Sequence, residues 1–507
     1  MKRYGLLLVG SLLLGSCGTG STPAAQVELS GVVSEGRGQE AVAGATVEAV
    51  GLNLKAVTDN NGRWTLKVPG GRTVDLLMTK ANHASALVQD LDVSKTTYLE
   101  EVLRPAFDPA LTTVPGRMTV DLANGTAVAA GAELKVKIDL DVQDPARNSL
   151  MTGIASLEQP GGYSSTMNGS VVRHLFLDAR GDNSVTFEAG DFSAYKGEVP
   201  VHFVAYDLNG NRTHLIRYVK VEPAAAAAAV VAPTDVKPRA ITFADKLTYS
   251  PQSLTPRTLQ ALSSSGLLER AGLSGDLEPL AAPEQATLWV DVRFKYPVTA
   301  AAPRAFELWR SADGTNFSKI VTAAPERVLL DEETGSYRIR DTSSQLTAGE
   351  KVHYKVVAVS DAGQAESAVN DVTPLGRFTV DLLSPGQAAT GVDLRPIFRW
   401  AGQGEAANTY YQVMVLDRIQ GEGQSIAWLS EELENEHTAV YNFDGSAKQP
   451  SLQPYHAYEW ELVALTVSED GKAIAVGSDY FNLLGLFANS GASVQSAEVH
   501  EFVTGGR

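Results

Sequence analysis

The chain has a single cysteine, Cys17, among its 507 residues. No internal disulfide can therefore form, and the protein depends on apolar cores for its stability. Basic residues are also few, with 42 Lys and Arg against 59 Asp and Glu, and the net charge is −17. This balance argues against nucleic acid as a partner, because nucleic acids are bound by clustered Lys and Arg that displace counterions. It also disfavours adhesion of the protein surface to anionic lipid headgroups.

Long apolar runs and long amphipathic helices are absent from the sequence. The apolar run at residues 6–14 is too short to span a hydrocarbon core of about 30 Å. The alanine tract at residues 224–229 is flanked by Glu222 and Pro233, which indicates a linker. From residue 27 onward, short β-type runs are separated by Gly, Asn and Asp, and this pattern predicts an all-β protein built of tandem β-sandwiches.

Motifs of the common enzyme classes are absent as well. The sequence has no Gly-x-Ser-x-Gly elbow, no His-Glu-x-x-His helix, no phosphate-binding Gly-x-x-x-x-Gly-Lys loop and no dinucleotide fingerprint. Its eight histidines are scattered, and no two are spaced as metal ligands on one helix. We therefore expect no catalytic residues and no cofactor. A hydrolase whose catalytic residues follow no recognisable motif is the remaining enzymatic alternative.

The N-terminal residues follow the order of a cleaved export signal. A basic start, an apolar run and two small residues precede the cysteine (Lys2, Arg3, residues 6–14, Gly15, Ser16 and Cys17). This arrangement resembles the lipobox of bacterial lipoproteins, which implies that residues 1–16 are removed and that Cys17 is lipidated. The chain would then be held in the cell envelope by its lipid, with residues 17–26 as a tether. Gly18 in place of Asp points to the outer membrane if the envelope has two. The alternative is a plain secretory signal with an incidental cysteine.

Residues 27–105 form the first predicted domain. The segments GVV at 31–33, VAGATV at 42–47 and TDNNGRWTLKVPGG at 58–71 resemble carboxypeptidase regulatory-like domains, which are seven-stranded sandwiches of prealbumin type. Residues 110–222 form the second domain. Its segment FVAYDLNGN at 203–211 resembles the closing hairpin of bacterial immunoglobulin-like domains.

Residues 223–238 are predicted as a linker, and residues 239–375 as a third domain with a segment inserted at about 250–283. The segments FELWRSADGTNF at 306–317 and YKVVAVSDAG at 354–363 resemble central strands of fibronectin type III domains. In that family a tyrosine follows the Leu and Gly matched here by Leu346 and Gly349. Val352 occupies the tyrosine position, and Tyr354 is the alternative.

Residues 376–485 form the fourth predicted domain, and residues 486–507 are predicted as a flexible tail. The segments SPGQAATGV at 384–392 and PIFRW at 396–400 resemble the opening of bacterial fibronectin III-like domains. The spacing of Leu452 and Tyr458 matches the tyrosine corner, in which the hydroxyl bonds upstream backbone. The resemblance implies that Tyr458 and the core tryptophan Trp400 stabilise the domain.

Three candidate ligand contacts follow from the sequence. Asp207, Asn209 and Asn211 present oxygen groups at alternate positions, which suits either calcium or a tight turn, and we favour the turn. Pairing of the hairpin about Asn209 and Gly210 would place His202 opposite Arg217, so that His202 and His214 form no zinc site. Trp428 is the tryptophan expected to face solvent and to be available for a ligand.

These features predict a non-enzymatic, lipid-anchored envelope protein that acts as a spacer or scaffold. Its sandwiches would bind envelope proteins or polysaccharide through loops and sheet edges. The alternative is a carbohydrate- or solute-binding lipoprotein that serves an envelope enzyme or transporter.

Overall fold

The computed structural model describes residues 25–35, 40–109, 115–141, 150–159, 169–178, 181–222, 229–243, 288–343, 345–419, 423–477 and 499–506. The signal peptide, Cys17 and the inserted segment at 250–283 lie outside these residues. The described chain is almost entirely β-structure, as predicted, and its one helix is the single turn α3 (Pro325–Val328). No helix in this part of the chain is long and apolar enough to cross a bilayer.

Strands β1–β8 form the first module, a sandwich in which alternate residues point into the core. In β5, for example, Trp64, Leu66 and Val68 are buried between exposed neighbours. One sheet holds β1 (Gln26–Glu35), β2 (Glu40–Ala41), β5 (Arg63–Pro69) and β8 (Tyr98–Leu103). The other holds β3 (Thr46–Ala49), β4 (Leu54–Val57), β6 (Thr73–Thr79) and β7 (Ala86–Asp92).

The second module has its own core, which includes Phe187, Phe192 and Phe203. Its smaller sheet holds β9 (Arg117–Val120), β11 (Leu134–Asp141) and β14 (Asn183–Phe187). Its larger sheet holds β10 (Thr126–Ala129), β12 (Leu150–Leu157), β13 (Val172–Phe176), β15 (Gly197–Asp207) and β16 (Arg212–Glu222).

The third module packs around Phe294, Phe306 and Tyr354. One sheet holds β17 (Thr234–Phe243), β18 (Leu288–Lys295), β21 (Leu329–Asp331) and β22 (Ser336–Asp341). The other holds β19 (Ala305–Ser311), β20 (Ser318–Ala323), β23 (Val352–Ser360), β24 (Gly363–Glu366) and β25 (Asn370–Val372).

The fourth module has the most aromatic core, which includes Phe398, Trp400, Trp428 and Trp460. Its smaller sheet holds β26 (Thr379–Ser384), β28 (Ile397–Gln403) and β32 (Thr438–Val440). Its larger sheet holds β27 (Ala389–Val392), β29 (Asn408–Ile419), β30 (Gly423–Leu429), β31 (Leu433–Glu434), β33 (Ala457–Val467), β34 (Ala473–Val476) and β35 (His500–Thr504).

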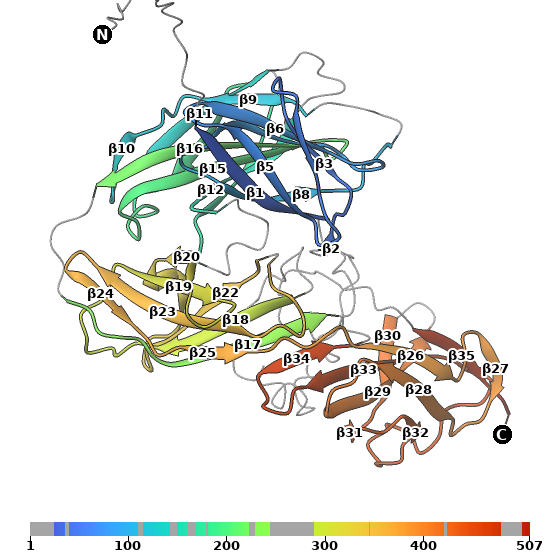
Figure 1. Ribbon diagram of the computed structural model, residues 1–507. Helices are drawn as coiled ribbons and strands as arrows, with labels where there is room; N and C mark the ends of the chain where they lie inside the picture. Colours follow the sequence, from blue (N-terminus) through green and yellow to red (C-terminus); the bar gives the residue numbers. More distant parts are fainter. Residues whose placement is uncertain are drawn as a thin grey trace, which may run out of the picture.

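Two sheets continue from one module into the next (Figure 1). β16 of the second module pairs in parallel with β7 of the first, from Arg212 opposite Ala86 to Leu215 opposite Gln89. β17 of the third module pairs in parallel with β34 of the fourth, from Ala240 opposite Ala473. Backbone hydrogen bonds therefore join the modules in two pairs.

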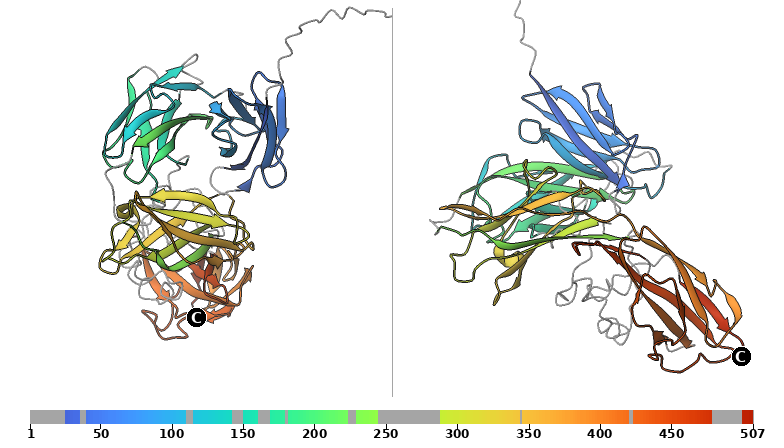
Figure 2. Two further views of the ribbon diagram at one scale, coloured as in Figure 1. Left: turned by 60° about the vertical axis from the view of Figure 1, so that its left-hand side comes forward. Right: turned by 60° about the horizontal axis from the view of Figure 1, so that its bottom comes forward.

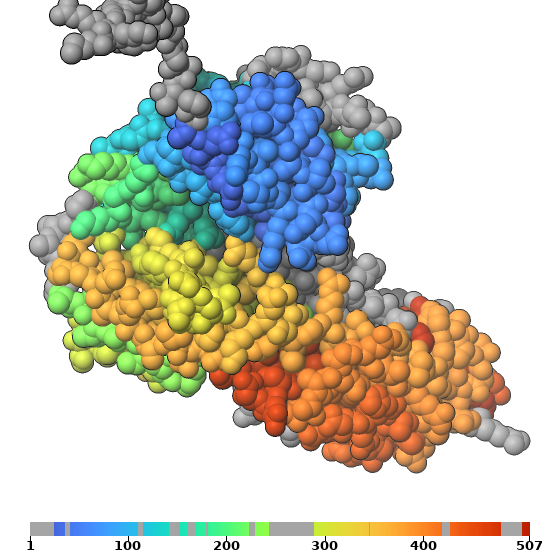
Figure 3. All heavy atoms as spheres, viewed as in Figure 1, coloured from blue at the N-terminus to red at the C-terminus, as the bar shows by residue number. Residues whose placement is uncertain are grey.

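The first two modules lie side by side, with the third beneath both (Figure 2). The space-filling view shows the first three modules packed together and the fourth projecting from the third (Figure 3).

The linker predicted at residues 223–238 is wrong over its second part, because β17 begins at Thr234. Val236, Pro238 and Ala240 are buried in alternation, as expected of a strand. Pro238 is tolerated because the parallel pairing with β34 starts only at Ala240, so no strand of the described residues pairs with the preceding part of β17 on that side.

The flexible tail predicted at residues 486–507 is also wrong at its end. β35 pairs antiparallel with β33 and in parallel with β27, and Phe502 lies in the aromatic core. The sequence obscures this strand because more than twenty residues separate it from β34, which pairs with the same strand β33.

We expect Phe502→Ala to lower the stability of the fourth module by about 3–5 kcal/mol, because it empties a large buried aromatic site. Val503, the next residue, is 37% exposed, so Val503→Ala should cost about 1 kcal/mol or less. Urea unfolding monitored by tryptophan fluorescence compares the two variants. Equal, small effects would contradict the placement of β35 in the core.

Candidate functional site at the junction of the first three modules

The turn between β15 and β16 fastens the second module to the first. Asp207 Oδ1 accepts hydrogen bonds from the backbone N–H of Asn209 and of Asn211, each at 2.9 Å. Asn209 Oδ1 accepts from the N–H of Asp108 (2.7 Å), and Asn211 Oδ1 accepts from the N–H of Ser85 (2.8 Å).

The oxygen atoms that suggested calcium therefore accept hydrogen bonds from N–H groups, among them that of Ser85 in the first module and that of Asp108 in the segment between β8 and β9. Burial raises the pKa of Asp207, and its hydrogen bonds with Asn211 and the turn backbone oppose that shift. Within the described ranges, no three His, Cys, Asp or Glu side chains are grouped to hold a metal ion.

The hairpin register differs by one residue from the predicted one, so the expectation that His202 faces Arg217 is wrong. His202 lies opposite Ile216, and Val204 lies opposite His214. The cause is the turn, in which the N–H of Asp207 donates to the carbonyl of Asn211 and leaves three residues in the loop. This register makes the two histidines diagonal neighbours on one face of the sheet.

The histidines belong to a buried hydrogen-bonded chain that starts in the first module. His214 Nδ1 lies 2.6 Å from Glu101 Oε1, on β8. His214 Nε2 lies 2.9 Å from His202 Nδ1. His202 Nε2 lies 3.2 Å from the carbonyl oxygen of Glu158, next to β12. Arg212 forms an ion pair with Glu101, and each of these five residues except Glu158 is buried.

Burial is the main influence on the charge states in this cluster. It lowers the pKa of His202 well below its usual value, and the neighbouring His214 lowers it further. It lowers the pKa of His214 in the same way, with a further contribution from Arg212. The pKa of Arg212 falls to about 9 because of burial. At pH 7 both imidazoles are therefore neutral, while Arg212 keeps its charge.

Glu158 continues the chain into the third module. Its carboxylate accepts hydrogen bonds from the N–H (2.7 Å) and the hydroxyl (2.9 Å) of Thr322 and pairs with Lys319 at 2.6 Å. Its backbone has a φ of 67°, a conformation that non-glycine residues rarely adopt and that is found where surrounding contacts impose it. A second ion pair, Arg327 with Asp191 at 2.7 Å, joins the same two modules.

Sequence reasoning missed Glu101 entirely. It lies between Leu99 and Leu103 on the inward face of β8, so a carboxylate occupies a core position of an alternating strand. A charged residue in such a position is itself a signal, because buried charges require partners. Its neighbour Glu100 points the other way, toward Ser343 of the third module, at 3.4 Å.

The tyrosine alternatives in the last two modules differ in their contacts. The hydroxyl of Tyr354 donates to Asp341 at 2.9 Å, and Asp341 also pairs with Arg310. Tyr354 therefore binds a carboxylate, whereas the tyrosine corner requires a bond to upstream backbone. The hydroxyl of Tyr458 accepts the N–H of Gln453 at 3.0 Å, which is tyrosine-corner geometry.

Trp400 is buried in the core of the fourth module, whereas the expected exposure of Trp428 is wrong. Trp428 is 1% exposed, packs against the rings of Phe398 and Tyr441, and donates its indole N–H to Asp444 at 3.0 Å. Trp428 points into the core from β30, and its neighbour Ala427 is half-buried. The polar residues at the start of β30 hid this burial pattern in the sequence. Trp428 is therefore a core residue and no ligand contact.

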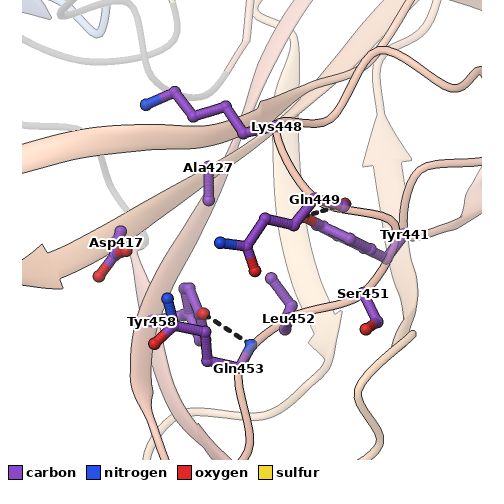
Figure 4. Close-up of a pocket in the computed structure, with 9 residues that line it drawn as sticks. All are labelled: Asp417, Ala427, Tyr441, Lys448, Gln449, Ser451, Leu452, Gln453 and Tyr458. Carbon is purple, nitrogen blue, oxygen red and sulfur yellow. Dashed lines mark hydrogen bonds between the residues drawn. The ribbon is translucent and has the colours of Figure 1, made fainter.

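A small pocket of mixed polar and apolar lining lies beside Tyr458 (Figure 4). It is lined by Asp417, Ala427, Tyr441, Lys448, Gln449, Ser451, Leu452, Gln453 and Tyr458. Asp417 pairs with His456 at 2.6 Å, and the Tyr441 hydroxyl donates to the Gln449 carbonyl at 3.2 Å. The amide of Gln449 points into the pocket (Figure 4).

No family profile matches the sequence. An uncharacterized protein of Deinococcus radiodurans is 29% identical over 254 residues, which are 47% of this chain and 44% of that protein. The chain thus spans less than half the length of this relative.

Among solved structures, the chain is similar to the FN1–FN3 domains of chicken CNTN1, with 10% identity, 78% of this chain and 100% of that one covered, and a TM-score of 0.28. It is also similar to a Ca²⁺-stabilized adhesin of an Antarctic bacterium, with 16% identity, 90% and 93% covered, and a TM-score of 0.16. These likenesses concern the fold alone.

We expect Tyr458→Phe to cost about 1–3 kcal/mol, because it leaves the N–H of Gln453 without its acceptor. The matched control is Tyr455→Phe, since Tyr455 is 79% exposed and should change stability by no more than about 0.5 kcal/mol. Urea unfolding of both variants tests this. An effect of Tyr455→Phe as large as that of Tyr458→Phe would contradict the structural role of the corner.

Proposed function

We propose that the chain is a non-enzymatic, lipid-anchored protein of the cell envelope, whose tandem sandwiches form a stiff spacer and present binding surfaces away from the membrane. The observation that supports this most is the continuation of two sheets through module boundaries. A domain connected by backbone pairing cannot swing as a domain on a flexible linker does.

The contacts between modules support the same proposal. Polar and charged side chains are used to hold the modules in place: the turn at Asp207, the chain from Glu101 to Glu158 and the ion pair of Arg327 with Asp191. The described chain starts on the first module, and the fourth module projects from the third (Figure 1). A lipid at Cys17 would thus hold the first module near the membrane and leave the fourth available to partners.

A second candidate function, the binding of carbohydrate, is favoured by the pocket beside Tyr458. Its carboxylate, lysine, amide and hydroxyl groups are of the kinds that exchange hydrogen bonds with sugar hydroxyls. Calorimetric titration of the full chain with a panel of envelope polysaccharides distinguishes the two functions. Heat of binding that Gln449→Ala abolishes and Gln364→Ala, on exposed β24, leaves unchanged would favour this second function.

The anchor is tested by expressing the full chain in a bacterium and separating detergent and aqueous phases. Wild-type protein should enter the detergent phase, because each buried CH₂ contributes about 0.8 kcal/mol and two or three acyl chains hold durably. Cys17→Ser should be soluble or remain uncleaved, whereas Ser16→Ala, which keeps a small residue before the cysteine, should behave as wild type. Recovery of wild-type protein in the aqueous phase would contradict the anchor.

A further inference from the structure

The chain of contacts from Glu101 to Glu158 has an uncommon property: its two ends both accept hydrogen bonds. Glu101 ends it with a carboxylate oxygen, and Glu158 ends it with a carbonyl oxygen. Three contacts between four groups therefore need three protons, and two neutral imidazoles supply only two. The contact without a proton is the longest one, 3.2 Å between His202 Nε2 and the carbonyl oxygen of Glu158.

One added proton can therefore be accommodated, but a second cannot. With His202 protonated, its Nε2–H would donate to the Glu158 carbonyl while its Nδ1–H still donates to His214. With both histidines protonated, two N–H donors would face each other across the present 2.9 Å contact. Two positive charges would also lie beside Arg212 in a buried site, where Glu101 is the one carboxylate among the described residues that contacts them.

Other charged groups on the surrounding strands face elsewhere and have their own partners. Asp90 on β7 pairs with Arg217 on β16, and the carboxylate of Glu158 pairs with Lys319. Asp207 on β15 is held within its turn. Among the described residues, the charged groups that contact or act on the histidine pair are thus Glu101 and Arg212.

The position of the pair decides what its protonation would do. His202 and His214 lie on β15 and β16, and β16 carries the parallel pairing with β7 that joins the two modules. His214 is opposite Val88 in that pairing and contacts Glu101 across the first module's core. Repulsion at this point acts directly on the strand that connects the modules.

We propose that His202 and His214 form an acid-sensitive latch, which holds the first two modules together at neutral pH and loosens the β7–β16 junction when both imidazoles take up protons. The latch goes beyond the spacer function and needs neither the lipid anchor nor a ligand.

The direction of the pH dependence follows from the folded-state pKa values, which lie below the usual value of 6.5 because of burial. Histidines with lowered pKa values stabilise the closed junction above about pH 6.5, and this stabilisation is lost as the pH falls. Between pH 7.5 and 5.5 each histidine can raise the opening equilibrium up to about tenfold. The first proton is partly accommodated, so we expect an increase between about tenfold and hundredfold.

Hydrogen–deuterium exchange of the full chain at pH 7.5, 6.5 and 5.5 measures this opening. Rates for peptides that cover β7 and β16 are divided by the intrinsic rate at each pH, and peptides of β33 in the fourth module serve as the internal reference. The test compares wild type with His202→Gln/His214→Gln, in which neutral amides replace both imidazoles. His174→Gln is the matched control, because His174 is an exposed histidine of the same module on β13.

Between pH 7.5 and 5.5, the corrected exchange rates of β7 and β16 should rise tenfold to hundredfold in wild type and in His174→Gln. The corrected rates of β33 should show no comparable change. The double variant should change by less than about twofold. If that variant does not fold, His202→Gln alone should reduce the increase to tenfold or less. A flat response of wild type, or an increase in the glutamine variants as steep as in wild type, would overturn the latch.

Discussion

Parallel backbone pairing across module boundaries is the constraint on which the rest of the structure depends. β16 completes the second module with one face and the first module with the other: Leu215 and Val219 lie in the second core, whereas Ile216 and Tyr218 lie in the first. β34 also contributes to two cores, but along one face: Ala473 lies in the third core and Ala475, two residues further on, in the fourth. A strand shared in this way also covers sheet edges that would otherwise be exposed.

This sharing explains where the polar residues between modules lie. Where a sheet passes from one module to the next, its strands lie between two separate apolar cores. The space at the boundary between these cores is occupied by polar side chains. At the first boundary the space is filled by Glu101, Arg212 and two histidines, which contact one another through an ion pair and hydrogen bonds. Such a network specifies one arrangement of the modules, because any other would leave buried charges without partners.

The sequence could predict the all-β fold, because period-two alternation is a local property of each strand. It could also locate Trp400 and Tyr458, whose positions depend on spacing within one module. The shared sheets could not be predicted, because parallel pairing between distant strands leaves no local signal. The contact of His202 with His214 depended on one extra residue in a turn, since a shift of one residue changes every cross-strand partner.

The errors about Trp428, β17 and β35 have related causes. In each case the local composition is polar or proline-containing. The strands that pair with β17 and β35 lie far away in the sequence, and Trp428 is buried by rings of other strands, Phe398 and Tyr441. Tertiary pairing overrides local propensity at such positions.

The central claim, that a continuous sheet fixes the first two modules relative to each other, is tested most directly by a distance between its ends. β13 and β4 lie at opposite ends of the shared sheet, and Phe176 and Val57 on them are 92% and 63% exposed. Spin labels at Phe176→Cys and Val57→Cys, in a full chain carrying Cys17→Ser, can be measured by pulsed electron paramagnetic resonance at pH 7.5. Seven strand-to-strand steps of about 4.8 Å separate them, so the account predicts one narrow distribution at no more than about 40 Å. A broad distribution, as expected of modules on a flexible linker, would contradict it.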